Sequence, residues 1–279
     1  MIGLILDEFH FASLWNGGIL LFVLFGAIIY LFILPAGKEH SIWKAILFFI
    51  GSIALFVSVG SPLNIVGRIQ YSSHIIQILL LLFIAPPLMI YGLKRKWFDH
   101  VIATYPAVKK TVYALTHPVF AMVIFYILFY GYHIPAIFNF ARVDLYINYF
   151  YLLVLFIAAI LLWVPIFSKH RLTKKQKMLY SLINMILLLP YGFVLLLANG
   201  NLYTVYTDLS SFISALEVCL PVEKSLPKTY YEALLPFAPV DEQVKGGKIL
   251  IVGVIAIFSL MMGLVRFVKS KPNTSKEDV

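Results

Sequence analysis

Charged residues are scarce in this chain. Only 13% of its 279 residues are Asp, Glu, Lys or Arg, whereas a typical soluble domain carries about 25%. Cysteine is nearly absent, because Cys219 is the only one, and a disulfide-stabilised domain is therefore excluded. The chain also lacks a Cys-x-x-Cys pair and a Walker phosphate loop. So little charge cannot cover the surface of a water-soluble fold of this size, which excludes a soluble enzyme.

Hydrophobic residues dominate the composition of the chain. They make up 61% of the chain, and the mean hydropathy is +0.91. A membrane-spanning helix needs roughly 20 mostly apolar residues, and the sequence lacks the in–out alternation of a transmembrane barrel. We therefore predict an all-α membrane protein, a single integral domain over residues 1–279 built as a seven-transmembrane-helix bundle. The predicted spans are about 17–34, 43–59, 72–91, 119–138, 147–167, 180–197 and 249–268.

The basic residues are divided unequally between alternate loops. The segments that follow the first, third, fifth and seventh spans, with their flanks, hold 16 of the 22 Lys and Arg residues. The positive-inside rule then places the N-terminus outside and the C-terminus in the cytoplasm. We interpret the basic segments as topology signals and contacts to anionic lipids of the bilayer, and expect no nucleic acid as a partner. An amphipathic helix is expected in the cytoplasmic segment Lys94–His117, and 199–248 is predicted to be an external loop.

Two histidines fall within predicted spans. His74 lies about one turn into the third span, and His133 lies about 15 residues into the fourth, which runs the opposite way. Both are therefore expected in the outer third of the membrane on neighbouring helices. An ionisable group in a span is a functional candidate, and imidazole is a common ligand of copper, zinc and haem iron. A histidine that is hydrogen-bonded within the bundle is the alternative, and both interpretations stay open.

Other residues near these histidines have two interpretations each. Pro86–Pro87 are expected to kink or break the third helix and Pro135 the fourth, which either shapes a cavity or only serves packing. Cys219, alone on the outer side, is either a copper(I) ligand or a buried structural thiol. Several tyrosines are expected near the outer interface, where an aromatic belt explains them without a further function. These are Tyr71, Tyr132, Tyr203 and Tyr206.

Short motifs follow one another in order along most of the chain. In the third span, Ser73–His74–Ile75–Ile76–Gln77 leads to Ala85–Pro86–Pro87. Before the last span, Asp241–Glu242–Gln243 is followed by Gly246–Gly247. The order and spacing of these motifs on seven spans resemble the CtaG-type cytochrome c oxidase assembly factors of Gram-positive bacteria. The other matching motifs are Leu14–Trp15, Ser61–Pro62–Leu63, Tyr132–His133–Ile134–Pro135, Leu202–Tyr203, Tyr206–Thr207 and Cys219–Leu220–Pro221.

The resemblance implies a seven-helix protein needed to produce an active haem–copper oxidase. Many relatives carry a second histidine four residues after the first, where this chain has Ile78, and often another near the start of the fifth span, where it reads 145–149 Leu-Tyr-Ile-Asn-Tyr. A metal site built from histidine pairs is therefore depleted here. The remaining candidate metal ligands are His74, His133 and Asp241, with copper as the expected metal and no resident cofactor assigned.

Three classes of function compete. The first is a non-enzymatic assembly factor of the bacterial plasma membrane, which binds haem–copper oxidase subunits and assists copper insertion or subunit maturation from the outer face. The second is a transporter of a small solute or metal ion. Transporters usually bind near the midplane, which is almost purely apolar here. The third is a membrane metalloenzyme, for which two histidines offer too few ligands. We expect the assembly factor, with Asp241 and Glu242 as an external acidic gate.

Overall fold

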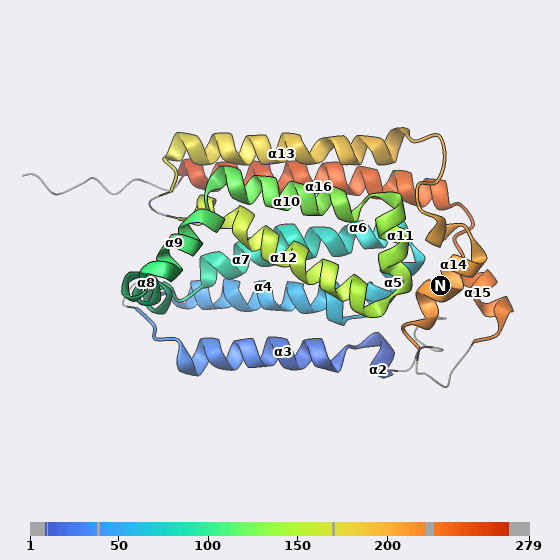
Figure 1. The fold of residues 1–279 in the computed structure, drawn as a ribbon, viewed down its shortest axis with the longest axis horizontal. Coiled ribbons are helices and arrows are strands. Elements are labelled where there is room, and N and C mark those ends of the chain that lie inside the picture. Colours follow the sequence, from blue (N-terminus) through green and yellow to red (C-terminus); the bar gives the residue numbers. More distant parts are fainter. Residues whose placement is uncertain (1–8, 10, 38–39, 169–170, 221–225, 268–279) are drawn as a thin grey trace, which may run out of the picture.

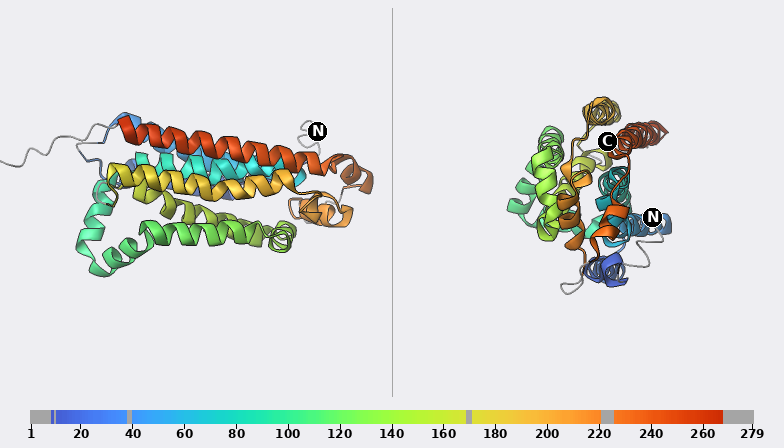
Figure 2. Two further views of the ribbon diagram at one scale, coloured as in Figure 1. Left: turned by 90° about the horizontal axis from the view of Figure 1, so that it is seen from above. Right: turned by 90° about the vertical axis from the view of Figure 1, so that its right-hand side faces the viewer.

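The computed structural model describes residues 9, 11–37, 40–168, 171–220 and 226–267, and all regular structure within these ranges is helical. Long helices lie side by side along the longest axis of the molecule (Figure 1). The view from above and the view along the axis show an elongated bundle (Figure 2). This architecture confirms the prediction of an all-α protein that crosses the membrane several times.

Five helical segments of the described chain are long and apolar enough to cross a bilayer. A sixth is added if α9 (Pro106–Leu115) and α10 (Pro118–Tyr132), which meet at a bend of 62°, form one span. The first predicted span forms α3 (Gly17–Ile28) and the π-helical η1 (Ile29–Ile33), which together are shorter than the five. The total of seven spans and the orientation therefore stay predictions. The five segments are α4 (Ile42–Gly60), the continuous run of α6 (Tyr71–Leu79), η2 (Leu80–Ile84) and α7 (Ala85–Gly92), α12 (Leu145–Phe167), α13 (Lys174–Leu197) and α16 (Pro239–Phe267).

The predicted fourth span, 119–138, is not one helix. The structure ends α10 at Tyr132 and begins α11 (Pro135–Val143) three residues later. Pro135 has no N–H to donate, and it holds Ile134 in an extended conformation with φ −62° and ψ 127°. The expected break after His133 is therefore present, and His133 becomes the residue that caps the end of α10.

The two prolines of the third span have a milder effect than a break. Pro86 cannot donate to the carbonyl of Leu82, four residues earlier. The chain widens into the π-helical η2 before these prolines, and the indole Nε1–H of Trp163 on α12 donates to that Leu82 carbonyl at 2.9 Å. Because water is absent from the bilayer core, such a replacement donor is needed. The third span therefore continues through the prolines as one membrane-crossing segment.

Short helices gather at both ends of the bundle (Figure 1). At one end the predicted cytoplasmic amphipathic helix is divided into α8 (Arg95–Thr104) and α9, because Pro106 starts a new helix. At the opposite end lie α2, α5, α11, η3, α14 and α15, and we call this the loop end of the bundle. The bounds of the remaining short helices are Phe11–Leu14 for α2, Leu63–Ile69 for α5, Thr204–Tyr206 for η3, Leu209–Glu217 for α14 and Lys228–Leu234 for α15.

Helix α16 packs along both α13 and α6 at very short range. Glycines permit this approach. A Cβ atom on Gly247 would lie 2.9 Å from the carbonyl oxygen of Gly192 on α13, and one on Gly246 would lie 3.0 Å from the ring of Tyr71 on α6. In lipid, burying an apolar side chain contributes little to stability, because the lipid tails that it leaves are equally apolar. Close backbone contact between helices is therefore a main source of stability there. The Gly246–Gly247 motif thus has a packing role.

Large apolar side chains cover much of the outside of the bundle. Phe32 is 80% exposed, Val252 67% and Phe22 64%. In a membrane these side chains contact lipid tails and need no further partner. The polar side chains that are buried inside the bundle are therefore the more informative ones.

Replacing Gly247 with Ala should destabilise the protein, because the added methyl group meets the backbone of α13. We expect a loss of about 1–3 kcal/mol in the free energy of unfolding, seen as a lower Tm of the detergent-purified protein. Gly263 on the same helix is the matched control, since a Cβ atom there meets nothing within 4 Å. Gly263→Ala should leave Tm unchanged or raise it, because alanine is the better helix former. Equal effects of the two variants would contradict the packing role of Gly247.

Candidate functional site

The two histidines singled out from the sequence meet inside the bundle. His74 lies in the first turn of α6, and His133 caps α10. Their ring centroids are 5.9 Å apart, and the two side chains are 0% and 4% exposed. The structure thus brings both imidazoles together, and their depth in the membrane stays a prediction. We call this pair and the aromatic rings around it the histidine site.

Hydrogen bonds fix the tautomer of each imidazole. Nε2 of Gln77 donates to the carbonyl of Ser58 at 2.8 Å and to Oδ1 of Asn64 at 3.0 Å, so Oε1 is the amide atom that faces His74. Nδ1 of His74, 3.1 Å from that oxygen, must carry the hydrogen in the neutral ring. Nδ1 of His133 likewise donates to the carbonyl of Phe129 at 2.7 Å. Each neutral ring therefore leaves Nε2 as a bare acceptor.

Both Nε2 atoms are buried and lack a hydrogen-bond partner among the described residues. Aromatic rings enclose them. The ring of Phe138 lies 5.1 Å from the His74 ring and 6.2 Å from the His133 ring, and Tyr191 lies 4.6 Å from His133. Buried acceptors without donors are uncommon and costly in proteins. A neutral imidazole nitrogen without a donor can ligate a metal ion.

A chain of tyrosines lies beside the histidine site. The hydroxyl of Tyr203 donates to the carbonyl of His133 at 3.0 Å, and the Tyr191 hydroxyl links Tyr203, at 2.7 Å, to Tyr71. The interpretation of Tyr71, Tyr132, Tyr203 and Tyr206 as an aromatic belt is wrong, because all four are at most 2% exposed. Burial raises the pKa of Tyr203 to about 12, so this hydroxyl keeps its proton. These tyrosines are internal hydrogen-bonding groups that attach the loop end to the spans.

Two arginines that the distribution of charge predicts only to lie on the outer side are buried beside the same site. Arg68 on α5 and Arg142 on α11 are each 1% exposed. Arg142 donates from Nη2 to the carbonyl of Gly67 at 2.8 Å, and the backbone of Gly67 packs against His74. Both guanidinium groups act electrostatically on the His74 ring. No sequence signal marked them, because charge counting gives the side of the membrane and not the direction of a side chain.

The acidic motif does not join the histidines. Asp241 is exposed on the first turn of α16. Glu242 accepts a hydrogen bond from Ser72 on α6, and Lys245 lies 3.4 Å from it. Gln243 is fully buried, and its Oε1 accepts from the N–H of Leu202 at 2.9 Å. In the described ranges no group of three or more His, Cys, Asp or Glu side chains is arranged to hold a metal ion. The motif instead attaches α16 to α6 and to the chain that follows α13.

Cys219 follows α14 in the turn at its end. Its thiol is free and half-buried, and it packs against an apolar cluster of the loop end that includes Ile65 and Phe212. Its N–H donates to the carbonyl of Leu216 at 2.9 Å. This environment favours the interpretation of Cys219 as a structural thiol.

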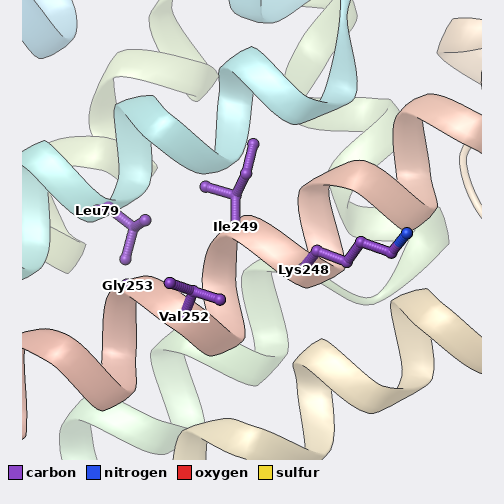
Figure 3. A pocket seen from close by; sticks show the side chains of 5 residues that line it. All are labelled: Leu79, Lys248, Ile249, Val252 and Gly253. Atoms are coloured by element: carbon purple, nitrogen blue, oxygen red, sulfur yellow. The ribbon is translucent and has the colours of Figure 1, made fainter.

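A hollow of about 420 Å³ lies on the outside of the bundle between α6 and α16 (Figure 3). It is lined by Leu79, Lys248, Ile249, Val252 and Gly253, so its walls are almost wholly apolar. None of the residues of the histidine site contributes to it. Because it faces the lipid side of the bundle, it needs no ligand other than lipid tails.

The histidine site offers two neutral nitrogen ligands in a water-poor aromatic enclosure. Zinc sites usually have four ligands, and catalytic ones at least three from the protein, so two imidazoles do not make a site for zinc. The adjacent guanidinium charges also disfavour a doubly charged cation. Copper(I), which is singly charged and accepts few ligands, fits the donor set better.

The fold and this site define a polytopic membrane protein with a buried imidazole pair near one end of its bundle. Over residues 20–270 the sequence matches the family described as Cytochrome c oxidase caa3 assembly factor (Caa3_CtaG). Since the match covers most of the chain, the protein belongs to this family, and the resemblance inferred from its motifs is confirmed. Comparisons with curated proteins and with solved structures gave no significant match.

Replacing Gln77 with Leu should leave three buried groups unpaired: Nδ1–H of His74, the Ser58 carbonyl and the Asn64 amide oxygen. We expect a loss of about 2 kcal/mol or more in the free energy of unfolding, measured as a lower Tm of the purified protein. In ¹⁵N NMR of labelled histidine, the His74 signal should shift while the His133 signal stays in place.

Gln70→Leu is the control for this change. Among the described residues, the Gln70 side chain at the start of α6 accepts a single long bond, 3.4 Å from Ser73. Its effect on Tm should be small. If Gln77→Leu were as mild as Gln70→Leu, Gln77 would not be what fixes the His74 tautomer.

Proposed function

We propose that the protein acts in the bacterial plasma membrane as a non-enzymatic assembly factor for a caa3-type cytochrome c oxidase, and that it handles copper(I) for an oxidase subunit at the outer face. Family membership over residues 20–270 supports the role in oxidase assembly. The proposal that the protein binds copper(I) rests on the pair of adjacent buried imidazoles, whose Nε2 atoms have no partner among the described residues.

The residues around the histidine site favour the binding of a soft, singly charged metal ion such as copper(I). Gln77 and the Phe129 carbonyl hold the hydrogens of both rings on Nδ1, so both Nε2 atoms stay free to accept an ion. The rings of Phe138, Tyr132 and Tyr191 exclude water. A site with two ligands binds copper(I) less firmly than a closed site of three or four ligands, as transfer to another protein requires.

Action at the outer face is supported by the position of the site and by the charges of the chain. The histidine site lies where α6 begins and α10 ends, next to the loop end. The uneven distribution of basic residues in the sequence predicts that this end is outside. We assign Asp241, which is exposed on the first turn of α16, to contact with an oxidase subunit rather than to the ion.

Deletion of the gene should lower the activity and the copper content of the caa3-type oxidase in isolated membranes. Complementation with the wild-type chain should restore both, whereas His74→Ala and His133→Ala should each leave the oxidase copper content reduced by roughly tenfold or more. His117→Ala is the matched control, because His117 is exposed at the opposite end of α10. Immunoblots of membranes must show equal amounts of each variant.

The outcomes separate the parts of the proposal. Normal oxidase in the deletion strain would remove the assembly role. Full complementation by the doubly substituted chain would remove the copper role and leave a protein that only stabilises an oxidase subunit.

Purified protein in detergent should bind one copper(I) per chain and no zinc(II) in competition with a chromophoric chelator. His74→Ala or His133→Ala should weaken copper(I) binding by roughly tenfold or more, and His117→Ala should not change it. Zinc binding as tight as copper binding would show that the two-ligand assignment is wrong.

A further inference from the structure

Arg68 and Arg142 form a cross-linked pair at the loop end, where α5, α11 and α14 come together (Figure 1). Nη1 of Arg68 donates to the carbonyl of Arg142 at 2.5 Å and to that of Ala215 at 3.0 Å. Nη2 of Arg142 donates in return to the carbonyl of Gly67, the residue before Arg68. The same Nη2 also donates to the hydroxyl of Tyr206 at 3.2 Å, so each arginine donates hydrogen bonds from one nitrogen only.

The other nitrogens of the pair are buried without an acceptor among the described residues. They are Nε and Nη2 of Arg68 and Nε and Nη1 of Arg142. Nε and Nη2 of one guanidinium form a planar edge whose two N–H groups point in parallel. This edge matches the spacing of two oxygens of a carboxylate or a phosphate, to which arginine binds with two bonds.

No negative charge compensates the pair within the described ranges. The ion pairs there, Lys228–Glu232 and Lys245–Glu242, do not involve either arginine. The side chains that act electrostatically on Arg142 are Tyr206, Tyr132 and Cys219, and none is a carboxylate. Burial raises the pKa of Tyr206 despite the nearby Arg142, so its hydroxyl stays neutral. A cation–π contact, with Cζ of Arg142 5.0 Å from the Phe138 ring centroid, offsets only part of the cost of burial.

Two buried positive charges with no counter-ion among the described residues are costly to leave unpaired, and the free guanidinium edge of Arg68 specifies the shape of the missing group. We propose that Arg68 and Arg142 form a binding site for one oxyanion carrying a phosphate group. That group is supplied either by inorganic phosphate from the aqueous phase or by the phosphodiester of a phospholipid headgroup. This inference goes beyond the proposed role in oxidase assembly and does not depend on copper.

The test uses the full chain purified in a phosphorus-free detergent, dodecylmaltoside, after removal of lipid. One arm adds inorganic phosphate and the other adds phosphatidylglycerol, with Tm as the readout. A specific site should give a saturable rise in Tm of roughly 5 °C in one arm, because a ligand that binds only the folded state stabilises it. Radiolabelled phosphate should bind at one per chain where the first arm responds.

Arg68→Lys keeps the charge but removes the free planar edge, and Arg142→Lys keeps the charge but removes the free Nε and Nη1 donors. Each variant should therefore lose most of the rise in Tm. Arg171→Lys is the matched control and should keep it, because Arg171 donates to Thr116 and stacks on Tyr113 elsewhere in the structure. A response to phosphate identifies the free ion as the source, and a response to phosphatidylglycerol alone identifies the lipid.

The proposal is overturned if neither arm raises Tm, or if the two lysine variants respond as the wild-type chain does. If a lysine variant fails to accumulate in membranes, the wild-type titrations still decide, because the absence of a saturable response in both arms excludes the site.

Discussion

The bilayer core holds no water, so each polar atom buried among the spans needs a partner from the protein itself. The structure meets this constraint in specific ways. Trp163 donates to the Leu82 carbonyl that Pro86 cannot serve, and Tyr203 donates to the carbonyl of His133 where α10 ends. Gln77 joins the carbonyl of Ser58, the amide of Asn64 and the ring of His74. The positions of α6, α10 and α12 depend on these bonds.

Against that background, the buried atoms without partners are informative. Several of them belong to two pairs of like side chains, the imidazoles of His74 and His133 and the guanidiniums of Arg68 and Arg142. The two pairs lie beside each other, because Gly67 accepts from Arg142 and also packs against His74. A random packing defect would leave scattered single atoms unpaired. Matched pairs at one end of the bundle are better explained by ligands.

The sequence alone predicts those features of the site that depend only on how far along a span a residue lies. An ionisable residue in an apolar span is visible by inspection, and opposite helix directions place His74 and His133 at one level. The direction of a side chain was not visible in the same way. Tyr71 and Tyr203 lie where an interfacial aromatic belt is expected, but their side chains are buried. Arg68 and Arg142 belong to segments predicted to be external, but their side chains are buried as well. The break at Pro135 was predictable from its missing N–H, whereas the Trp163 donor that lets the third span pass Pro86 was not, since it comes from another helix.

The arrangement also has an electrostatic consequence that links the two pairs. With both guanidiniums unpaired, the positive potential at His74 opposes the arrival of any cation, including copper(I). An oxyanion on the arginines would cancel most of that potential, so occupation of the anion site would favour a cation on the imidazoles, and each ligand would increase the affinity for the other by the same factor. If the anion left when a partner protein docked at the loop end, the affinity for the cation would fall at the moment of transfer. If both proposed ligands bind, the adjacent neutral and cationic side chains would let the bundle hold a metal ion and release it without a conformational change in its spans.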